Sequence, residues 1–150
     1  MTFTNVNENN SSSADLITPN RLADMELVGY LHRWSMKKRS KRANQYLHNI
    51  LAADEPILHD HPWDFRSMIL MGGYVEVTPQ GEFHRQAGDV YNKKATDLHY
   101  IRYVEPNTWT MVFTEETVRN WGFMLDGKWI DHEDFPGRPL EIIFRNGYTN

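Results

Sequence analysis

Short hydrophobic runs alternate with polar turn residues along most of the chain after residue 27. The runs are rich in Tyr, Trp, Val, Ile and Thr, and none is long enough for a helix of usual length. Asp126-Gly127, between two aromatic runs, predicts a tight hairpin turn. Regularly spaced short strands without an internal repeat indicate an all-β sandwich or barrel. The predicted strands are 28–34, 44–51, 57–61, 66–78, 82–85, 90–92, 98–104, 108–114, 121–125 and 128–132, with one more over 140–145.

The N-terminal segment has a different pattern. Its first residues are rich in Asn, Ser and Thr and show no helical or strand period, so we expect a flexible tail over residues 1–18. Thr18-Pro19 is a typical helix start and predicts a short N-terminal helix of two or three turns. A length of 150 residues suits one hydrophobic core, so we expect residues 19–150 to form a single domain.

Composition and charge narrow the class of protein. Hydrophobic residues make up 40% of the chain and charged residues 24%, as is typical of a soluble globular protein. No apolar run approaches the roughly 18 to 20 residues that cross a bilayer, and the first residues do not resemble a signal peptide, so we expect a cytoplasmic protein without membrane contact. A net charge of −4 argues against general nucleic-acid binding. The basic run from Lys37 to Arg42 is most simply a solvated loop.

The histidines are the candidate chemical groups. The chain has no cysteine, so any metal must be held by imidazole or oxygen ligands. In an extended strand residues i and i+2 share a face, so His59 and His61 can offer two imidazoles to one point while Asp60 faces away. Pro62 favours extended backbone at the residue before it and supports this geometry. The best candidate for a third ligand is His99, which lies in another predicted strand.

Asp64 is a further candidate for this site. A regular strand would direct Asp64 to the face opposite His61, so a bend at Pro62-Trp63 would be needed to bring it back. Asp64 could be a fourth metal ligand, a catalytic proton shuttle, or a carboxylate that caps a turn or orients a histidine. The simpler alternative for the three histidines is that they only form hydrogen bonds at the surface or in the core.

The residues around the histidine pair resemble the first motif of the cupin superfamily, G(X)5HXH(X)3-4E(X)6G. Residues 59–61 are similar to its HXH core, and the glycines that end the run 69–73 are similar to its terminal glycine. The leading glycine of the motif is absent. Asp64 stands slightly before the position of the family's glutamate, and Phe65 and Arg66 lie nearer to that position.

The second cupin motif, G(X)5PXG(X)2H(X)3N, has a similar counterpart later in the chain. Gly88 and His99 match its glycine and histidine at the family's spacing. Lys94, Thr96 and Tyr103 stand where the family has proline, glycine and asparagine. The resemblance therefore includes the three histidines but not every residue of either motif.

This resemblance covers about residues 45–115. More narrowly, the HDHPW sequence, the GGY of residues 72–74, and the segments 120–123 and 127–129 are similar to small single-domain cupins of phage and bacterial genomes. The resemblance implies a double-stranded β-helix, or jelly roll, with a metal near the barrel mouth. Cupin barrels often pair through sheet edges, so it also implies a homodimer as one candidate assembly. It implies no single reaction, because cupins include dioxygenases, isomerases, epimerases, lyases and non-catalytic binding proteins.

Three further residues are candidates for substrate binding. Trp63 lies beside the histidine motif and could present an aromatic ring to a ligand. Arg66 would select a carboxylate or phosphate if it points inward. His84 lies on the approach to the second motif and could line the cavity. The ordinary alternatives are core packing for the tryptophan and a solvated face for the histidine.

The sequence supports three interpretations of function. The first is a metal-dependent enzyme, a dioxygenase or an isomerase, that acts on a small polar or anionic molecule in the barrel. Its three histidines would bind a divalent transition metal, and iron, zinc, manganese and nickel all suit such ligands. The second is a non-catalytic cupin that binds a small molecule, such as a phage-encoded sensor or sequestering protein in the host cytoplasm. The third is a purely structural jelly roll.

Overall fold

The computed structural model describes residues 18–137 and 141–148, and the secondary structure of these residues consists of short strands and one 3-10 turn. The strands are β1 (Met25–Leu27), β2 (Leu31–Ser35), β3 (Asn44–Ile50), β4 (Phe65–Met71), β5 (Gly73–Thr78), β6 (Gly81–Gln86), β7 (Val90–Lys93), β8 (Tyr100–Val104), β9 (Thr108–Thr114), β10 (Gly122–Leu125), β11 (Lys128–Asp131) and β12 (Ile142–Phe144). The 3-10 turn η1 covers His132–Asp134. None of the described helices is long and apolar enough to cross a membrane.

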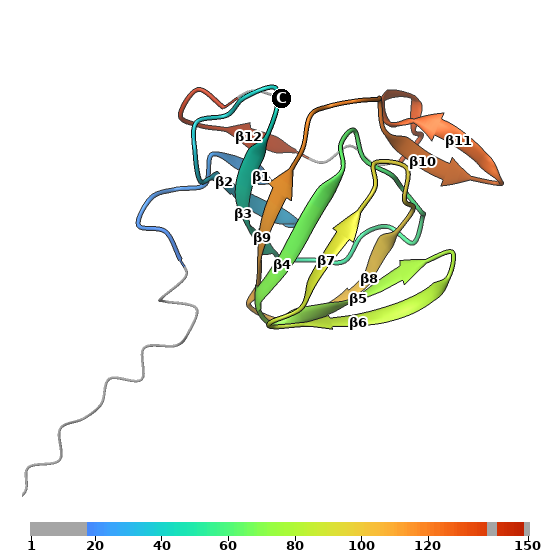
Figure 1. The fold of residues 1–150 in the computed structure, drawn as a ribbon, viewed down its shortest axis with the longest axis horizontal. Coiled ribbons are helices and arrows are strands. Elements are labelled where there is room, and N and C mark those ends of the chain that lie inside the picture. The colour runs from blue at the N-terminus through green and yellow to red at the C-terminus, as the bar shows by residue number, and fades with distance from the viewer. Residues whose placement is uncertain (1–17, 138–140, 149–150) are drawn as a thin grey trace, which may run out of the picture.

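The strands form two facing antiparallel sheets and a hairpin. One sheet has seven strands in the order β12-β1-β2-β3-β9-β4-β7, and the other has three in the order β6-β5-β8. The hairpin β10–β11 projects beside the barrel (Figure 1). Single bridges from His59 to His99 and from His59 to Phe123 join the smaller sheet to this hairpin. The all-β jelly roll predicted from the sequence is confirmed.

Alternate side chains along the strands point inward and fill the space between the two sheets. In β4, Phe65 and Ile69 point inward and are buried, whereas Arg66 between them is exposed. Apolar side chains removed from water in this way are the main favourable contribution to folding. The resulting core cluster consists of Phe65, Ile69, Tyr74, Tyr91, Ile101 and Val112.

The predicted N-terminal helix is wrong for the residues that the structure describes. Met25–Leu27 instead forms β1, which pairs with β2 on one side and with β12 on the other. Gly29, with a φ of +77°, makes the turn from β1 into β2. Pairing with two strands satisfies the backbone of β1 along both edges, and this tertiary context overrides a weak local helix signal.

The predicted strand over 66–78 is two strands, because the chain changes sheet at Gly72. Gly72 has a φ of +71°, and a Cβ atom placed there would lie 2.4 Å from Thr108 Oγ1. Only glycine fits this backbone and this close approach. The sharp corner directs β5 away from β4 and into the smaller sheet, where Glu76 faces the interior.

Candidate metal centre

Three histidines from two separate segments converge at one end of the barrel. One ring nitrogen from each of His59, His61 and His99 lies within 4.8 Å of the other two, and among the described residues this group contains no carboxylate. Reciprocal backbone hydrogen bonds of 2.9 and 3.0 Å hold His59 against His99. The backbone N–H of His61 donates to the carbonyl of Ala95 at 3.0 Å. The alternation expected for an extended segment thus places the rings of His59 and His61 beside each other.

A buried carboxylate fixes the orientation of the His99 ring. Glu76 Oε1 lies 2.7 Å from His99 Nδ1, and the side chain of Glu76 is fully buried. An ionised carboxylate can only accept a hydrogen bond, so Nδ1 of His99 carries a proton and Nε2 is the nitrogen left for another partner. That Nε2 faces His61 Nε2 at 3.3 Å. A carboxylate behind a histidine in this way is the usual support of a metal-binding imidazole.

Two cations stabilise the charge on Glu76. Arg85 donates to Glu76 Oε2 from Nε at 2.9 Å and from Nη2 at 2.7 Å, and Lys93 Nζ lies 2.7 Å from Oε1. Burial alone would raise the pKa of Glu76, but the hydrogen bonds from His99, Lys93 and Arg85 outweigh burial and lower it to about 2. Glu76 is therefore ionised at neutral pH.

The other two imidazoles are held in their neutral form. Burial, followed by the nearby His99, lowers the pKa of His59 to about 4. The same two causes, together with His59, lower the pKa of His61 well below its ordinary value. Neutral imidazole is the form that binds a metal, because protonation removes the lone pair.

His61 has a buried nitrogen that the protein does not satisfy. Within residues 18–137 and 141–148, Nδ1 of His61 is buried and has no hydrogen-bond partner. If Nε2 of His61 carries the proton and donates to His99, Nδ1 of His61 is a buried acceptor without a donor. If Nδ1 of His61 carries the proton, that N–H has no acceptor, and a lone pair on Nε2 of His61 faces Nε2 of His99. Either arrangement costs about 1–3 kcal/mol. An ion among the three rings would remove the repulsion between the two Nε2 atoms when Nδ1 of His61 carries the proton. The three imidazoles therefore fit a divalent transition metal.

Aromatic rings enclose the histidines on several sides. Trp63 stacks on His61 with ring centroids 5.5 Å apart, and Phe65 meets His61 edge-on at 4.7 Å. Phe123 from the hairpin lies 5.9 Å from His59. Phe65 is also one of the two residues near the position of the glutamate in the first cupin motif. An apolar ring therefore lies beside the imidazoles where the resemblance would have placed a carboxylate.

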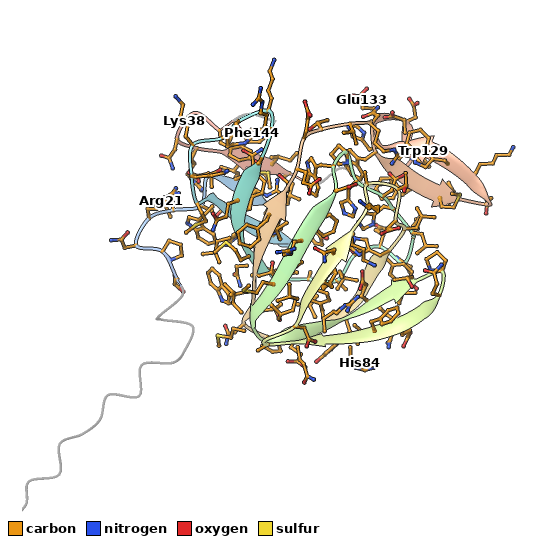
Figure 2. All side chains as sticks on the ribbon, in the orientation of Figure 1. Arg21, Lys38, His84, Trp129, Glu133 and Phe144 are labelled. Atoms are coloured by element: carbon orange, nitrogen blue, oxygen red, sulfur yellow. The ribbon has the colours of Figure 1, made fainter. Side chains whose placement is uncertain are left out.

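Asp60 points away from the histidines and connects the hairpin to this segment. It is 3% exposed and accepts hydrogen bonds from Gly122 N at 2.8 Å and from Trp129 Nε1 at 2.9 Å. Arg119 forms an ion pair with the same carboxylate. Trp129 lies on the projecting hairpin (Figure 2). Because side chains alternate along residues 59–61, the two histidines point toward the candidate site and Asp60 points toward the hairpin.

Asp64 is not brought to the three imidazoles. Its carboxylate accepts a hydrogen bond from Ala95 N at 2.7 Å and forms an ion pair with Lys94 at 3.1 Å. These contacts, the backbone hydrogen bond first, lower the pKa of Asp64. In this structure Asp64 has the position of a carboxylate that fixes the loop before His99.

The three candidates for substrate binding lie in different places. Trp63 stacks on a histidine of the group. Arg66 is exposed on the outer face of β4 and donates to Asn92 at 3.0 Å. His84 is exposed on the outer face of β6 (Figure 2). Strand alternation explains the placement of both, because their neighbours Phe65 and Arg85 take the inward positions.

Sequence reasoning missed Glu76, which supports His99. The available signal was a carboxylate inside the apolar run Tyr74-Val75-Glu76-Val77, since a charge in a strand of this kind is buried only when it is paired. Its partners come from three other segments of the chain, so the pairing itself is not visible in the sequence.

Comparison with known proteins shows the fold. No protein-family model matches the sequence, and no curated protein matches it. A histidine-to-glutamine variant of Streptomyces PAC13, solved with uridine, matches with a TM-score of 0.54 and 8% identity over 80% of this chain and 100% of that chain. A Ralstonia eutropha protein assigned as a mannose-6-phosphate isomerase matches with a TM-score of 0.51 and 14% identity over 57% of this chain and 84% of that chain. A cupin-2 domain containing protein from Shewanella frigidimarina has a TM-score of 0.47 and 13% identity over 56% and 79% of the two chains.

The chain has the cupin fold, with a group of three histidines that could bind a metal. Its resemblance to cupins, made on the two histidine motifs, is thereby confirmed at the level of the fold. The narrower resemblance to phage and bacterial proteins with an HDHPW sequence stays a prediction. Identities of 8% and 14% carry the fold and no activity.

Proposed function

We propose that the protein is a metal-binding cupin in which His59, His61 and His99 hold a divalent transition metal. The observation that carries this proposal is the pair of Glu76 and His99, 2.7 Å apart. A buried carboxylate that fixes one imidazole tautomer is the usual support of a metal-binding histidine, and it leaves Nε2 of His99 for the ion. The neutral state of the other two histidines supports the same conclusion.

The proposed activity is that of a metal-dependent enzyme, of oxygenase or isomerase type, on a small polar or anionic molecule. When bound, the ion supplies Lewis acidity and coordination positions that three protein ligands leave open. Glu76 accepts the hydrogen bond from Nδ1 of His99 and so keeps the proton of that ring on Nδ1. Trp63 and Phe65 keep water from the rings of the histidines on their side. A protein assigned as a mannose-6-phosphate isomerase has a similar fold, and that likeness extends to the fold alone.

The metal content of the purified full-length protein tests the proposal. We expect close to one ion per chain after purification without chelator, or after reconstitution with iron, manganese, nickel or zinc. The double variant His59→Ala/His61→Ala should lose the ion, whereas His84→Ala should keep it because His84 is exposed on the outer face of β6. A wild-type protein that takes up none of the four metals would overturn the proposal.

Turnover distinguishes an enzyme from a binding protein. The loaded protein should consume dioxygen or interconvert isomers of a bound small molecule, and the metal-free double variant should do neither. A loaded protein that returns its ligands unchanged after long incubation with dioxygen would retain the metal site and exclude the enzymatic part of the proposal.

A further inference from the structure

A cavity opens between β6 and β7, at the edges of the two sheets. Its volume is about 360 Å³, which lies in the range of small-molecule sites. Thr78, Phe83 and Arg85 line it from the smaller sheet, Lys93 lines it from β7, and Leu98 lines it from the segment between β7 and β8. None of the three histidines is among its lining residues, and the cavity is connected to them through Glu76, which contacts Arg85, Lys93 and His99.

The side chains of Arg85 and Lys93 are held in position in the cavity, and only some of their N–H groups have partners. The side chain of Lys93 is 10% exposed and that of Arg85 is 20% exposed. Arg85 lies over the ring of Tyr91 at 4.0 Å and over the ring of Phe83 at 5.0 Å, and these contacts hold its guanidinium in place. Both cations contact Glu76, which carries one negative charge against their two positive charges.

The donors of these two groups exceed the acceptors that the described residues give them. A guanidinium has five N–H donors and an ammonium has three. Arg85 uses two of its donors on Glu76 Oε2, and Lys93 uses one on Oε1. Asp97 also lines the cavity, but its carboxylate is exposed and accepts the backbone N–H of Lys94 at 2.8 Å. The remaining donors are therefore open to a ligand that enters the cavity.

We infer that Arg85 and Lys93 bind the carboxylate or phosphate group of a small anionic molecule in this cavity. The inference goes beyond the proposed function, because none of the three histidines lines this cavity. Glu76 Oε1 lies 2.7 Å from both Lys93 Nζ and His99 Nδ1, so one carboxylate connects the cations to the histidine. Arg85 and Lys93, rather than Arg66 and His84, are the groups that select the charge of the bound molecule.

Calorimetric titration of the full-length protein with inorganic phosphate and with malonate tests the inference. We expect one of these anions to bind, and Lys93→Met to weaken its affinity about tenfold or more because a charge-assisted hydrogen bond is lost. Glu76→Gln removes the negative charge that competes with the anion for Arg85 and Lys93, so this variant should bind the anion more tightly than the wild type. The two variants are thus expected to change the affinity in opposite directions. Arg102→Gln is the matched control, since Arg102 is half exposed and pairs with Glu82 on the outside of the small sheet.

The two probes distinguish the two sources of the anionic group. Tighter binding of phosphate identifies a phosphorylated ligand, and tighter binding of malonate identifies a carboxylic acid. Absence of binding by the wild type, or equal affinity in all variants, would overturn the inference. Metal content measured in the same samples reports on the proposed function separately: a loaded protein that binds neither anion contradicts only the inference, and a metal-free protein that binds one contradicts only the metal site.

Discussion

Glu76 and His99 form a buried carboxylate–imidazole pair with 2.7 Å between Oε1 and Nδ1. They come from different segments, since Glu76 is in β5 and His99 directly precedes β8. The pair sets which nitrogen of His99 is available, and Arg85 and Lys93 set the charge of the carboxylate. The candidate metal centre therefore depends on residues that do not touch the ion position themselves.

Replacing Glu76 with glutamine should lower metal affinity about 10- to 100-fold, because an amide is a weaker acceptor for the Nδ1–H of His99 and no longer fixes its tautomer. Competition with a chelator measures this affinity. Glu82→Gln is the matched control, since Glu82 is about half exposed and pairs with Arg102. Equal affinities for the wild type and Glu76→Gln would show that Glu76 only balances the charges of Arg85 and Lys93.

The metal-free protein should lose stability as the pH falls from about 6.5 to 4. The pKa of His59 is lowered to about 4 in the folded protein, so the unfolded chain binds its proton first as the pH falls. This contribution is complete above pH 6.5 and amounts to roughly 3 kcal/mol. Urea unfolding at a series of pH values measures it, and His59→Gln should have a flatter profile. A wild-type profile that is level over this range would contradict the lowered pKa.

A second loss of stability is expected at lower pH, from Glu76. Its pKa is lowered to about 2 by its hydrogen bonds, so its contribution is present above the unfolded value near 4.5 and disappears as the pH falls toward 2. The same urea series, extended to acid, should show a steeper decline in the wild type than in Glu76→Gln, which retains only the contributions of other carboxylates such as Asp64. Identical acid profiles would mean that Glu76 is not stabilised as an anion in the fold.

Gly72→Ala should destabilise the fold far more than Gly127→Ala. Both glycines have positive φ values, of +71° and +76°, but an added Cβ at Gly72 meets Thr108 whereas nothing lies within 4 Å of one at Gly127. The backbone term alone is about 1–2 kcal/mol, and the collision at Gly72 adds to it. Thermal unfolding measures both variants, and equal losses would contradict the close approach at the sheet corner.

Asp64→Asn should leave the metal content of the protein unchanged. The carboxylate contacts Ala95 N and Lys94 rather than the three imidazoles. Elemental analysis beside the wild type measures the effect. Loss of the ion in this variant would instead indicate that Asp64 is a fourth metal ligand, which was one of the alternatives predicted from the sequence.

The sequence could predict features with a local period and could not predict those made by distant contacts. Alternation predicted most strands, and the Asp126-Gly127 turn is present with positive φ values of 50° and 76°. The corner at Gly72 was missed because its cause is the approach of Thr108 from another strand. Among residues 18–27, a strand replaces the predicted helix because β1 pairs with β12, near the other end of the chain.

The candidate site shows the same division. His59 and His61 are neighbours by strand parity, and His99 followed from its spacing in the second cupin motif. Glu76 was missed because a single acidic residue in a strand acquires meaning only through partners on β6, β7 and the segment before β8. Parity alone directs Asp64 away from His61, as found, but its partners Ala95 and Lys94 come from another segment and are not visible in the sequence.

Asp60 links the backbone between the two histidines to the hairpin β10–β11. Its neighbours in the chain are His59 and His61, and its carboxylate accepts the indole N–H of Trp129. Any shift of the backbone between the two rings must move the acceptor of that indole, and indole emission responds to the charge and hydrogen bonding around it. The chain has five tryptophans, so the part of the emission that belongs to Trp129 is the difference between the wild type and Trp129→Phe. Titration of the metal-free chain with an ion can be followed by this difference without an attached dye.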